Sequence, residues 1–191
     1  LVVEDIVVPA TATPGVPFTV SWKTRNAGAV DLTGTWVETV ALSTDDTIGS
    51  DVVHTSVSFA GTLTAGGPAA ERSAQVTIPL DGLAGALRAV VTTDAGGAMT
   101  EASELKNTAI SAGSVAVPLQ LRLAADAAQV NENAAALGFT LTRNGSRTSA
   151  LTVNLVSDDT TELEVPATVD IPAGQASVRF NGTPKNDGIA D

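Results

Sequence analysis

Apolar and polar residues alternate along most of this chain, in short stretches that are separated by turn residues. Residues 18–23 show the pattern clearly, because Phe18, Val20 and Trp22 alternate there with polar residues. Successive side chains of a strand point to opposite faces, so a period of two predicts half-buried strands. No stretch longer than about eight residues has a clean helical period. The sequence therefore predicts an all-β fold.

The first 117 residues contain seven such stretches. Turn residues separate them at the short intervals that are typical of β-sandwiches. Seven strands in about 116 residues match the size of one immunoglobulin-like sandwich. Trp22 and Trp36 lie in alternating strands, which favours a place in the core over a sugar-binding platform. The expected strands are residues 1–8, 18–23, 35–43, 52–60, 71–78, 87–93 and 107–117.

A second unit begins near Leu119 with a further series of short alternating stretches. Asn144-Gly145 predicts a tight hairpin within it, because both residues tolerate positive φ. Five or six strands are expected in this unit, at residues 119–123, 137–142, 151–156, 168–171 and 176–180.

The predicted fold is therefore two tandem immunoglobulin-like β-sandwiches, residues 1–117 and 118–191, of which the second is incomplete. Residues 115–119, which join them, are too few to form a flexible linker.

The composition excludes several classes of function. A net charge of −11 and a pI near 4.3 argue against nucleic acid, because no basic patch is available to neutralise phosphates. No apolar run is long enough to insert into a membrane. The chain has no cysteine and one histidine, which excludes thiol nucleophiles, disulfides and multi-histidine metal sites. The acidic surplus fits a secreted protein or a calcium binder.

Short motifs follow one another along the first unit and cover nearly all of it. They are Leu1-Val2-Val3 with Pro9, Pro14-Gly15 before Phe18-Thr19-Val20-Ser21-Trp22, Asn26-Ala27-Gly28, Leu42-Ser43-Thr44-Asp45, Thr77-Ile78-Pro79, Val91-Thr92-Thr93-Asp94, and Glu101-Ala102-Ser103-Glu104 with Asn107. In this order they resemble the CARDB family, a cell-adhesion-related domain of bacteria. The resemblance implies an immunoglobulin-like sandwich in large, repetitive surface proteins, and it implies no shared ligand.

The segment from Asp94 to Asn107 carries the last part of this signature. Because the family often shows the same pattern, the resemblance implies that Asp94, Glu101, Glu104 and Asn107 organise a long hairpin through side-chain-to-backbone bonds. Metal binding by these residues is the less favoured alternative.

Part of the second unit resembles a Calx-beta domain or a close bacterial relative. The match runs through Val130-Asn131-Glu132-Asn133, Phe139-Thr140-Leu141-Thr142-Arg143, Leu151-Thr152-Val153-Asn154-Leu155, Ser157-Asp158-Asp159, Ile171-Pro172-Ala173-Gly174-Gln175 and Asn186-Asp187. A member of that family continues with two further strands, so the resemblance implies a partly uncovered core at Val153, Leu155, Val169, Val178 and Phe180. Completion by further residues of a parent protein is the favoured explanation, strand donation by a neighbouring molecule the second, and packing of the first unit against the gap the third.

Calx-beta domains bind calcium between acidic loops at one end of the sandwich. The residues of this chain that match those loops are Glu132, Asp158, Asp159 and Asp187. Lys185 and Asn186 stand where the family has acids, which weakens or abolishes the expected site, because calcium affinity rises with ligand charge.

A separate candidate calcium loop lies in the first unit, where Asp45, Asp46 and Asp51 fall within seven residues. Carboxylates of one tight loop suit a hard cation. The alternative, which is favoured, is a solvated turn in which Asp45 caps its own backbone.

His54 is the single histidine, and on a strand Ser56 shares its face. No third partner for a catalytic triad is recognisable, so the sequence predicts that the chain is not an enzyme. We expect a spacer segment of a large bacterial adhesin, located outside the cell or on its surface, with calcium as a possible stiffening ligand and the neighbouring domains of the same protein as its partners. The alternatives are a module that binds a protein or a glycan, and an accessory domain of a secreted depolymerase.

Overall fold

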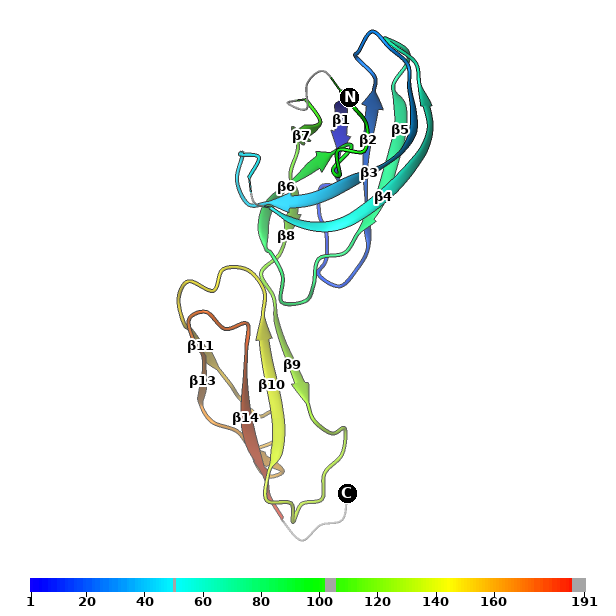
Figure 1. Ribbon diagram of the computed structural model, residues 1–191. Helices are drawn as coiled ribbons and strands as arrows, with labels where there is room; N and C mark the ends of the chain where they lie inside the picture. Colours follow the sequence, from blue (N-terminus) through cyan, green and yellow to red (C-terminus); the bar gives the residue numbers. More distant parts are fainter. Residues whose placement is uncertain (50, 102–105, 187–191) are drawn as a thin grey trace. The chain divides into compact units, whose positions relative to one another are not determined.

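The computed structural model describes residues 1–49, 51–101 and 106–186. All regular structure in these residues is β-strand, so the all-β prediction is confirmed (Figure 1). No helix of the described residues is long and apolar enough to cross a membrane. The chain divides into two compact units, unit 1 (Leu1–Pro118) and unit 2 (Leu119–Asp191), and each is described here by itself.

Unit 1 is a sandwich of two antiparallel sheets. One sheet has the strand order β1-β2-β5, and the other has the order β4-β3-β6-β7, with β8 also paired to β6. The chain therefore crosses between the sheets after β2, β4 and β5, as in immunoglobulin-like folds. The strands are β1 (Val2–Val7), β2 (Phe18–Arg25), β3 (Leu32–Ser43), β4 (Val52–Leu63), β5 (Ala70–Val76), β6 (Gly85–Thr92), β7 (Thr108–Ile110) and β8 (Val115–Val117).

The core of unit 1 lies between these two sheets. Val20 and Trp22 of β2 pack there against residues of β3 and β6 such as Leu42 and Val91. Trp36 belongs to a second, smaller cluster with Leu1 and Leu63. Both tryptophans are 1% exposed, which confirms their prediction as core residues.

Residues 107–117 were expected to be one strand, but the structure has two, β7 and β8. Both pair with β6, and the chain breaks between them at Ser111. The Ser111 hydroxyl accepts a hydrogen bond from the Ala89 amide (3.0 Å) and donates one to the Gly113 carbonyl (2.6 Å). The Ser111 hydroxyl thus replaces backbone hydrogen-bonding groups at the point where the strand is interrupted, as serine side chains often do in bends.

The loop before Phe18 makes one strand-like contact, because the Ala12 amide donates to the Ala116 carbonyl (3.0 Å) and Thr11 forms a parallel bridge with Ala116. The pairing of β3 with β4 has one irregularity, because Val40 lies opposite Thr55 and Ala41 lies opposite Val53, which makes His54 the extra residue of β4.

Unit 2 has a four-stranded sheet with the order β12-β14-β10-β9 and a two-stranded sheet of β11 and β13. Its buried core is small and contains Leu141, Val169 and Ile171. The strands are β9 (Leu121–Ala125), β10 (Leu137–Arg143), β11 (Leu151–Asn154), β12 (Leu163–Glu164), β13 (Thr168–Ile171) and β14 (Ser177–Pro184).

The described strands of unit 2 do not make a closed sandwich of seven strands, in agreement with the expected incomplete second sandwich. Four of the residues predicted to be partly uncovered are half-buried, namely Val153, Leu155, Val178 and Phe180. Val169 is the exception at 8% exposed, because it faces inward from β13 within the core cluster. Strand β12 was not predicted, since two residues are too short for a period.

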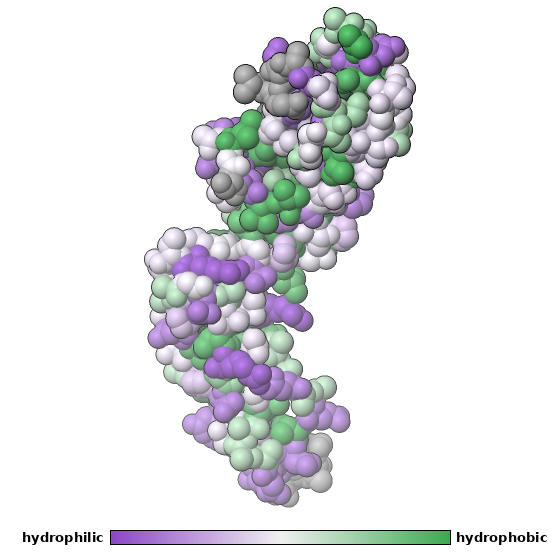
Figure 2. Space-filling view, viewed as in Figure 1, coloured by the Kyte–Doolittle hydropathy of each residue, from purple (hydrophilic) through white to green (hydrophobic). Residues whose placement is uncertain are grey.

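Both units present mixed surfaces. On the face that Figure 2 shows, hydrophilic and apolar residues alternate in small patches.

Candidate functional site

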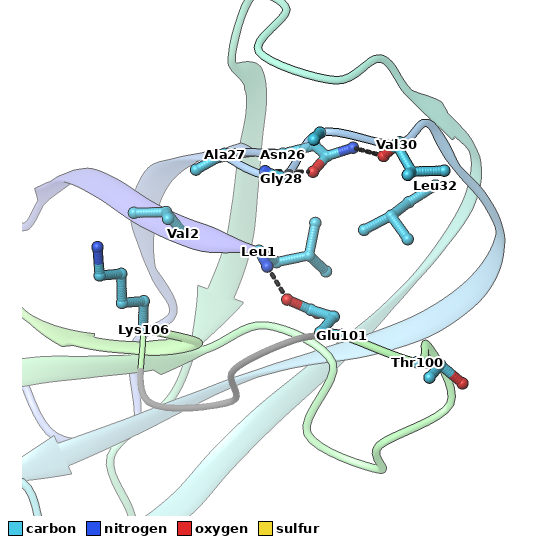
Figure 3. A pocket seen from close by; sticks show the side chains of 11 residues that line it. Leu1, Val2, Asn26, Ala27, Gly28, Val30, Leu32, Thr100, Glu101 and Lys106 are labelled. Carbon is cyan, nitrogen blue, oxygen red and sulfur yellow. Dashed lines mark hydrogen bonds and ion pairs between the residues drawn. The ribbon is translucent and has the colours of Figure 1, made fainter.

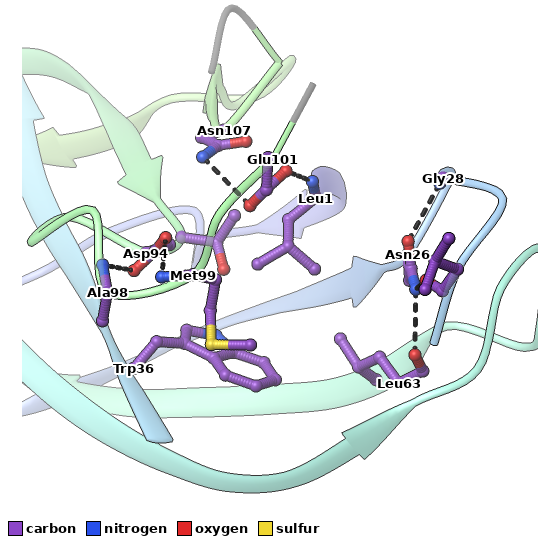
Figure 4. A network of polar contacts seen from close by, with 12 residues as sticks. Leu1, Asn26, Gly28, Trp36, Leu63, Asp94, Ala98, Met99, Glu101 and Asn107 are labelled. Carbon is purple, nitrogen blue, oxygen red and sulfur yellow. Dashed lines mark hydrogen bonds and ion pairs between the residues drawn. The ribbon is translucent and has the colours of Figure 1, made fainter. Parts of the chain in front are cut away.

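One end of unit 1 gathers the β2–β3 loop and the segment between β6 and β7, which carry much of the CARDB-like signature. Asn26 stands at the start of the β2–β3 loop and is 2% exposed. Its amide nitrogen donates to the carbonyls of Val30 (2.8 Å) and Leu63 (2.9 Å), and its amide oxygen accepts from the Gly28 amide (2.9 Å) (Figure 4). Asn26 therefore holds the loop in shape and ties it to the end of β4.

Asp94 has a similar role after β6. It is 4% exposed, and its backbone has a φ of +47°, which aspartate tolerates better than most residues. Its carboxylate accepts hydrogen bonds from the amides of Ala98 (2.8 Å) and Met99 (2.9 Å). These side-chain-to-backbone bonds confirm, for Asp94, the expected organisation of a long hairpin.

Two further signature residues meet at the same end. Glu101 accepts hydrogen bonds from the Leu1 ammonium and from the Asn107 amide (3.4 Å), and the Asn107 carbonyl accepts from the Thr93 amide (2.8 Å) (Figure 4). Glu104 lies outside the described residues.

A cavity of about 450 Å³ opens between the β2–β3 loop and the segment that contains Thr100 and Glu101 (Figure 3). Its lining is mainly apolar, with Glu101 and Lys106 as its charged residues. Asn26 and Thr100 add polar side chains to this lining.

A buried polar cluster around Glu38 of unit 1 was not predicted from the sequence. Glu38 of β3 is 1% exposed and points into the sandwich. Its carboxylate accepts hydrogen bonds from the indole nitrogens of Trp22 (2.6 Å) and Trp36 (3.2 Å), and from the Thr93 hydroxyl (3.0 Å). Buried indole N–H groups need an acceptor, and Glu38 supplies one for both tryptophans.

A cation accompanies this buried carboxylate. The Arg72 Nε atom of β5 lies 3.9 Å from a Glu38 carboxylate oxygen, and its guanidinium sits 3.8 Å above the centre of the Phe59 ring. Burial lowers the pKa of Arg72, and the charge of Glu38 opposes that shift. The cluster is part of the buried core of unit 1. One sequence signal did point to it, because Glu38 is two residues from Trp36 and therefore shares its inward face.

The acidic loop of unit 1 is organised locally. The Asp45 carboxylate accepts from the amide (2.8 Å) and the hydroxyl (2.7 Å) of Thr47, and these bonds hold the pKa of Asp45 below its usual range. Asp46 forms an ion pair with Arg88 (2.6 Å), and Asp51 accepts from the Gly49 amide (3.3 Å). Each of the three carboxylates thus has a different partner.

The candidate calcium ligands of unit 2 lie in two loops and in the segment that follows β14. Asp159 repeats the arrangement of Asp45, because Thr161 donates to it from its hydroxyl (2.5 Å) and its amide (3.0 Å), which lowers the pKa of Asp159. Asp158 beside it is exposed, and Glu132 is half-buried in the β9–β10 loop. Asp187 lies outside the described residues.

Both of these loops reach the same end of unit 2. The Asn186 amide donates to the Asn133 side chain (2.7 Å), next to Glu132, and the Leu163 amide donates to the Asp159 carbonyl (3.1 Å) near the end of β14. Lys185 pairs there with Glu164 (3.2 Å).

Within residues 1–49, 51–101 and 106–186, no three acidic or histidine side chains come close enough to hold one metal ion.

His54 lies on β4 and is half-buried. Its Nε2 atom is buried without a hydrogen-bond partner, and burial lowers the pKa of His54, partly offset by a hydrogen bond to the Thr77 backbone. Because the pKa of His54 is lower in the folded protein, the unfolded chain binds a proton at a higher pH than the folded chain does.

We therefore expect the contribution of His54 to stability to be complete above its unfolded pKa of 6.5 and to be lost as the pH falls through its lower folded value. The melting temperature of unit 1 should fall between about pH 7.5 and pH 5.5, and fall less in a His54→Gln variant. If the melting temperatures of the two proteins change with pH in the same way, His54 is not the cause of the loss.

Comparison with known proteins finds similarity among solved structures only. No family model matches the chain, and no curated protein matches it. Among solved structures, the chain is similar to the CARDB domain of a Pyrococcus furiosus protein in complex with di-metal ions, at 17% identity and a TM-score of 0.44. The match covers 61% of this chain and 86% of that one. The likeness concerns the fold alone, and the metal ions belong to that protein.

Proposed function

We propose that this chain is a non-enzymatic structural segment of a large bacterial extracellular or surface protein, in which it acts as a spacer between other domains. The observation that carries the proposal is that two residues of the CARDB-like motifs, Asn26 and Asp94, hold the loops of unit 1 in shape. Asn26 and Asp94 are buried, and their side chains hold backbone groups of neighbouring loops, which fits a role in stabilising the fold.

The connection between the two units supports the same role. In unit 1, Ala116 of β8 donates to the Ala10 carbonyl (2.9 Å), and β8 continues to Val117. In unit 2, the Gln120 amide already donates to the Asn144 side chain (2.7 Å). The chain between these anchors is therefore short, and a short connector limits independent motion of the domains it joins.

Backbone ¹⁵N relaxation of the whole chain tests this role. We expect the amides of both units to report one common rotational correlation time. Inserting a flexible Gly-Ser segment between Pro118 and Leu119 should give each unit its own, shorter correlation time. Independent tumbling in the unaltered chain would contradict the spacer role, and hydrolysis of esters, glycosides or peptides that is lost on His54→Ala would contradict the absence of catalysis.

Calcium enters this proposal through the Calx-beta resemblance of unit 2 and through the three closely spaced aspartates of the unit 1 loop. An ion that binds only the folded state raises stability by mass action, so we expect millimolar calcium to raise the melting temperature above its value in EDTA. Magnesium should have a smaller effect, because it demands tighter octahedral geometry. Asp45→Asn and Asp159→Asn variants assign the effect to one loop. Coinciding melting curves in calcium and EDTA would remove calcium from the proposal.

A further inference from the structure

The chain changes sheets near the start of unit 1. Strand β1 pairs with β2 in the three-stranded sheet, and residues 10–12 then bond to β8, which belongs to the opposite sheet. The Ala116 amide of β8 donates to the Ala10 carbonyl (2.9 Å), and the Ala116 carbonyl accepts from the Ala12 amide (3.0 Å). Both bonds of Ala116 thus go to the two neighbours of Thr11, so residues 10–12 and β8 run parallel.

Both partners of this parallel pair are anchored in the core of unit 1. Val115 and Val117, on either side of Ala116, are 0% and 3% exposed, and β8 is also paired with β6. Ala12 belongs to the same core cluster as the two valines. Neither partner can therefore slide along the other without breaking core contacts as well as hydrogen bonds.

The parallel direction decides how this pair responds to tension. In a parallel pair, the upstream end of one strand and the downstream end of the other lie at opposite ends of the pair. Leu1 lies upstream of residues 10–12, and Pro118 lies downstream of β8. Tension between Leu1 and Pro118 therefore pulls the two partners in opposite directions along their length, and it loads both hydrogen bonds at once.

Strand β1 carries the tension before residues 10–12 do. Two ion pairs cross its pairing with β2, one between Arg25 and Glu4 (2.6 Å) and one between Lys23 and Asp5 (2.9 Å). These side chains are partly exposed, so the ion pairs add little to the resistance of β1. If β1 leaves β2, the parallel pair still holds unit 1 closed.

We infer that the parallel pair of residues 10–12 with Ala116 is a mechanical clamp, by which unit 1 withstands tension between its two ends. The inference rests on the proposed spacer role, because a spacer between a cell surface and a bound ligand is under tension along its chain. It adds a load-bearing function to that role and assigns the function to two backbone hydrogen bonds.

Magnetic tweezers at constant force measure the unfolding rate of the full chain held at its two ends. The units are told apart by the length that each releases, roughly 400 Å for unit 1 and roughly 250 Å for unit 2. Ala116→Pro removes the amide that donates to Ala10, and we expect unit 1 to unfold about fivefold faster under force. Ala116→Ser keeps this amide at the same exposed position and should unfold at the rate of the unaltered chain.

A second pulling direction separates the clamp from a general loss of stability. The chain has no cysteine, so handles can be attached at Thr33→Cys and Thr62→Cys, which are paired, exposed residues at one end of β3 and β4. Tension there separates an antiparallel pair one bond after another, so unit 1 should unfold at a lower force than when it is pulled from its ends. Ala116→Pro should not change the unfolding rate in this direction.

The clamp is refuted if Ala116→Pro speeds unfolding equally in both pulling directions, or in neither. If Ala116→Pro does not fold, equal unfolding forces in the two directions without that substitution would refute it. Independent tumbling of the two units would contradict the spacer role and leave these measurements unaffected, because they concern unit 1 alone.

Discussion

Replacing Glu38 with alanine is expected to lower the free energy of unfolding of unit 1 by about 4 kcal/mol. The substitution leaves two buried indole N–H groups and the Thr93 hydroxyl without their acceptor. It also leaves Arg72 without its nearest carboxylate. Removing one partner of a buried charged cluster costs more than the cluster contributes, because the remaining groups stay desolvated.

Urea unfolding followed by tryptophan fluorescence measures this loss selectively, because both tryptophans of the chain, Trp22 and Trp36, lie in unit 1. Glu38→Gln keeps the shape but turns one acceptor into a donor, so we expect it to cost about 2 kcal/mol. Glu71→Gln, an exposed carboxylate on β5, is the control and should change stability by less than about 0.5 kcal/mol. If Glu38→Gln unfolds at the same urea concentration as the unaltered protein, the cluster has no stabilising role.

The second large effect is expected in unit 2. Ile171 of β13 is fully buried at 0% exposed and is one of three residues that form the buried core there. Truncating such a residue to alanine costs about 3 kcal/mol, through lost burial and the cavity that remains. A unit with a partly uncovered core has little stability to lose, since even complete domains are only about 5–15 kcal/mol stable. We therefore expect Ile171→Ala to leave unit 2 largely unfolded and unit 1 intact.

Amide NMR spectra distinguish the two units in this experiment. The signals of residues 119–186 should collapse to the narrow range of an unfolded chain, while those of unit 1 keep their positions. Val156→Ala, at an exposed position of the same unit, serves as the control and should preserve both sets of signals. Native unit 2 signals in Ile171→Ala would show that the unit has a larger reserve of stability than its described core provides.

The prediction of Trp22 and Trp36 as core residues needed only the alternation of β2 and β3, which is a local property of the chain. Glu38 shows what alternation leaves out. Its position two residues from Trp36 places it on the inner face. The sequence does not show which residues bond to a charged group there, because those residues come from other strands. Trp22 is 16 residues away and Thr93 is 55 residues away, on β2 and at the end of β6.

The acidic loops show a second limit of prediction from the sequence. For Asp45 the sequence favoured a turn that caps its own backbone over an ion site, and for Asp159 the Calx-beta resemblance implied a calcium ligand. In both loops the aspartate bonds to the threonine two residues further along. That Asp-x-Thr spacing is visible in the sequence and favours the capping alternative in the described conformation. Calcium binding itself stays a prediction.

By itself, the sequence determined that the fold is all-β and where most of the strands lie, because a period of two and its turn residues are set by neighbours along the chain. Only the tertiary structure decided which strands pair. It divided residues 107–117 into β7 and β8 and paired Thr11 with Ala116. Strand pairing depends on residues far apart in the chain, and the alternation of a single strand carries no information about which partner it meets.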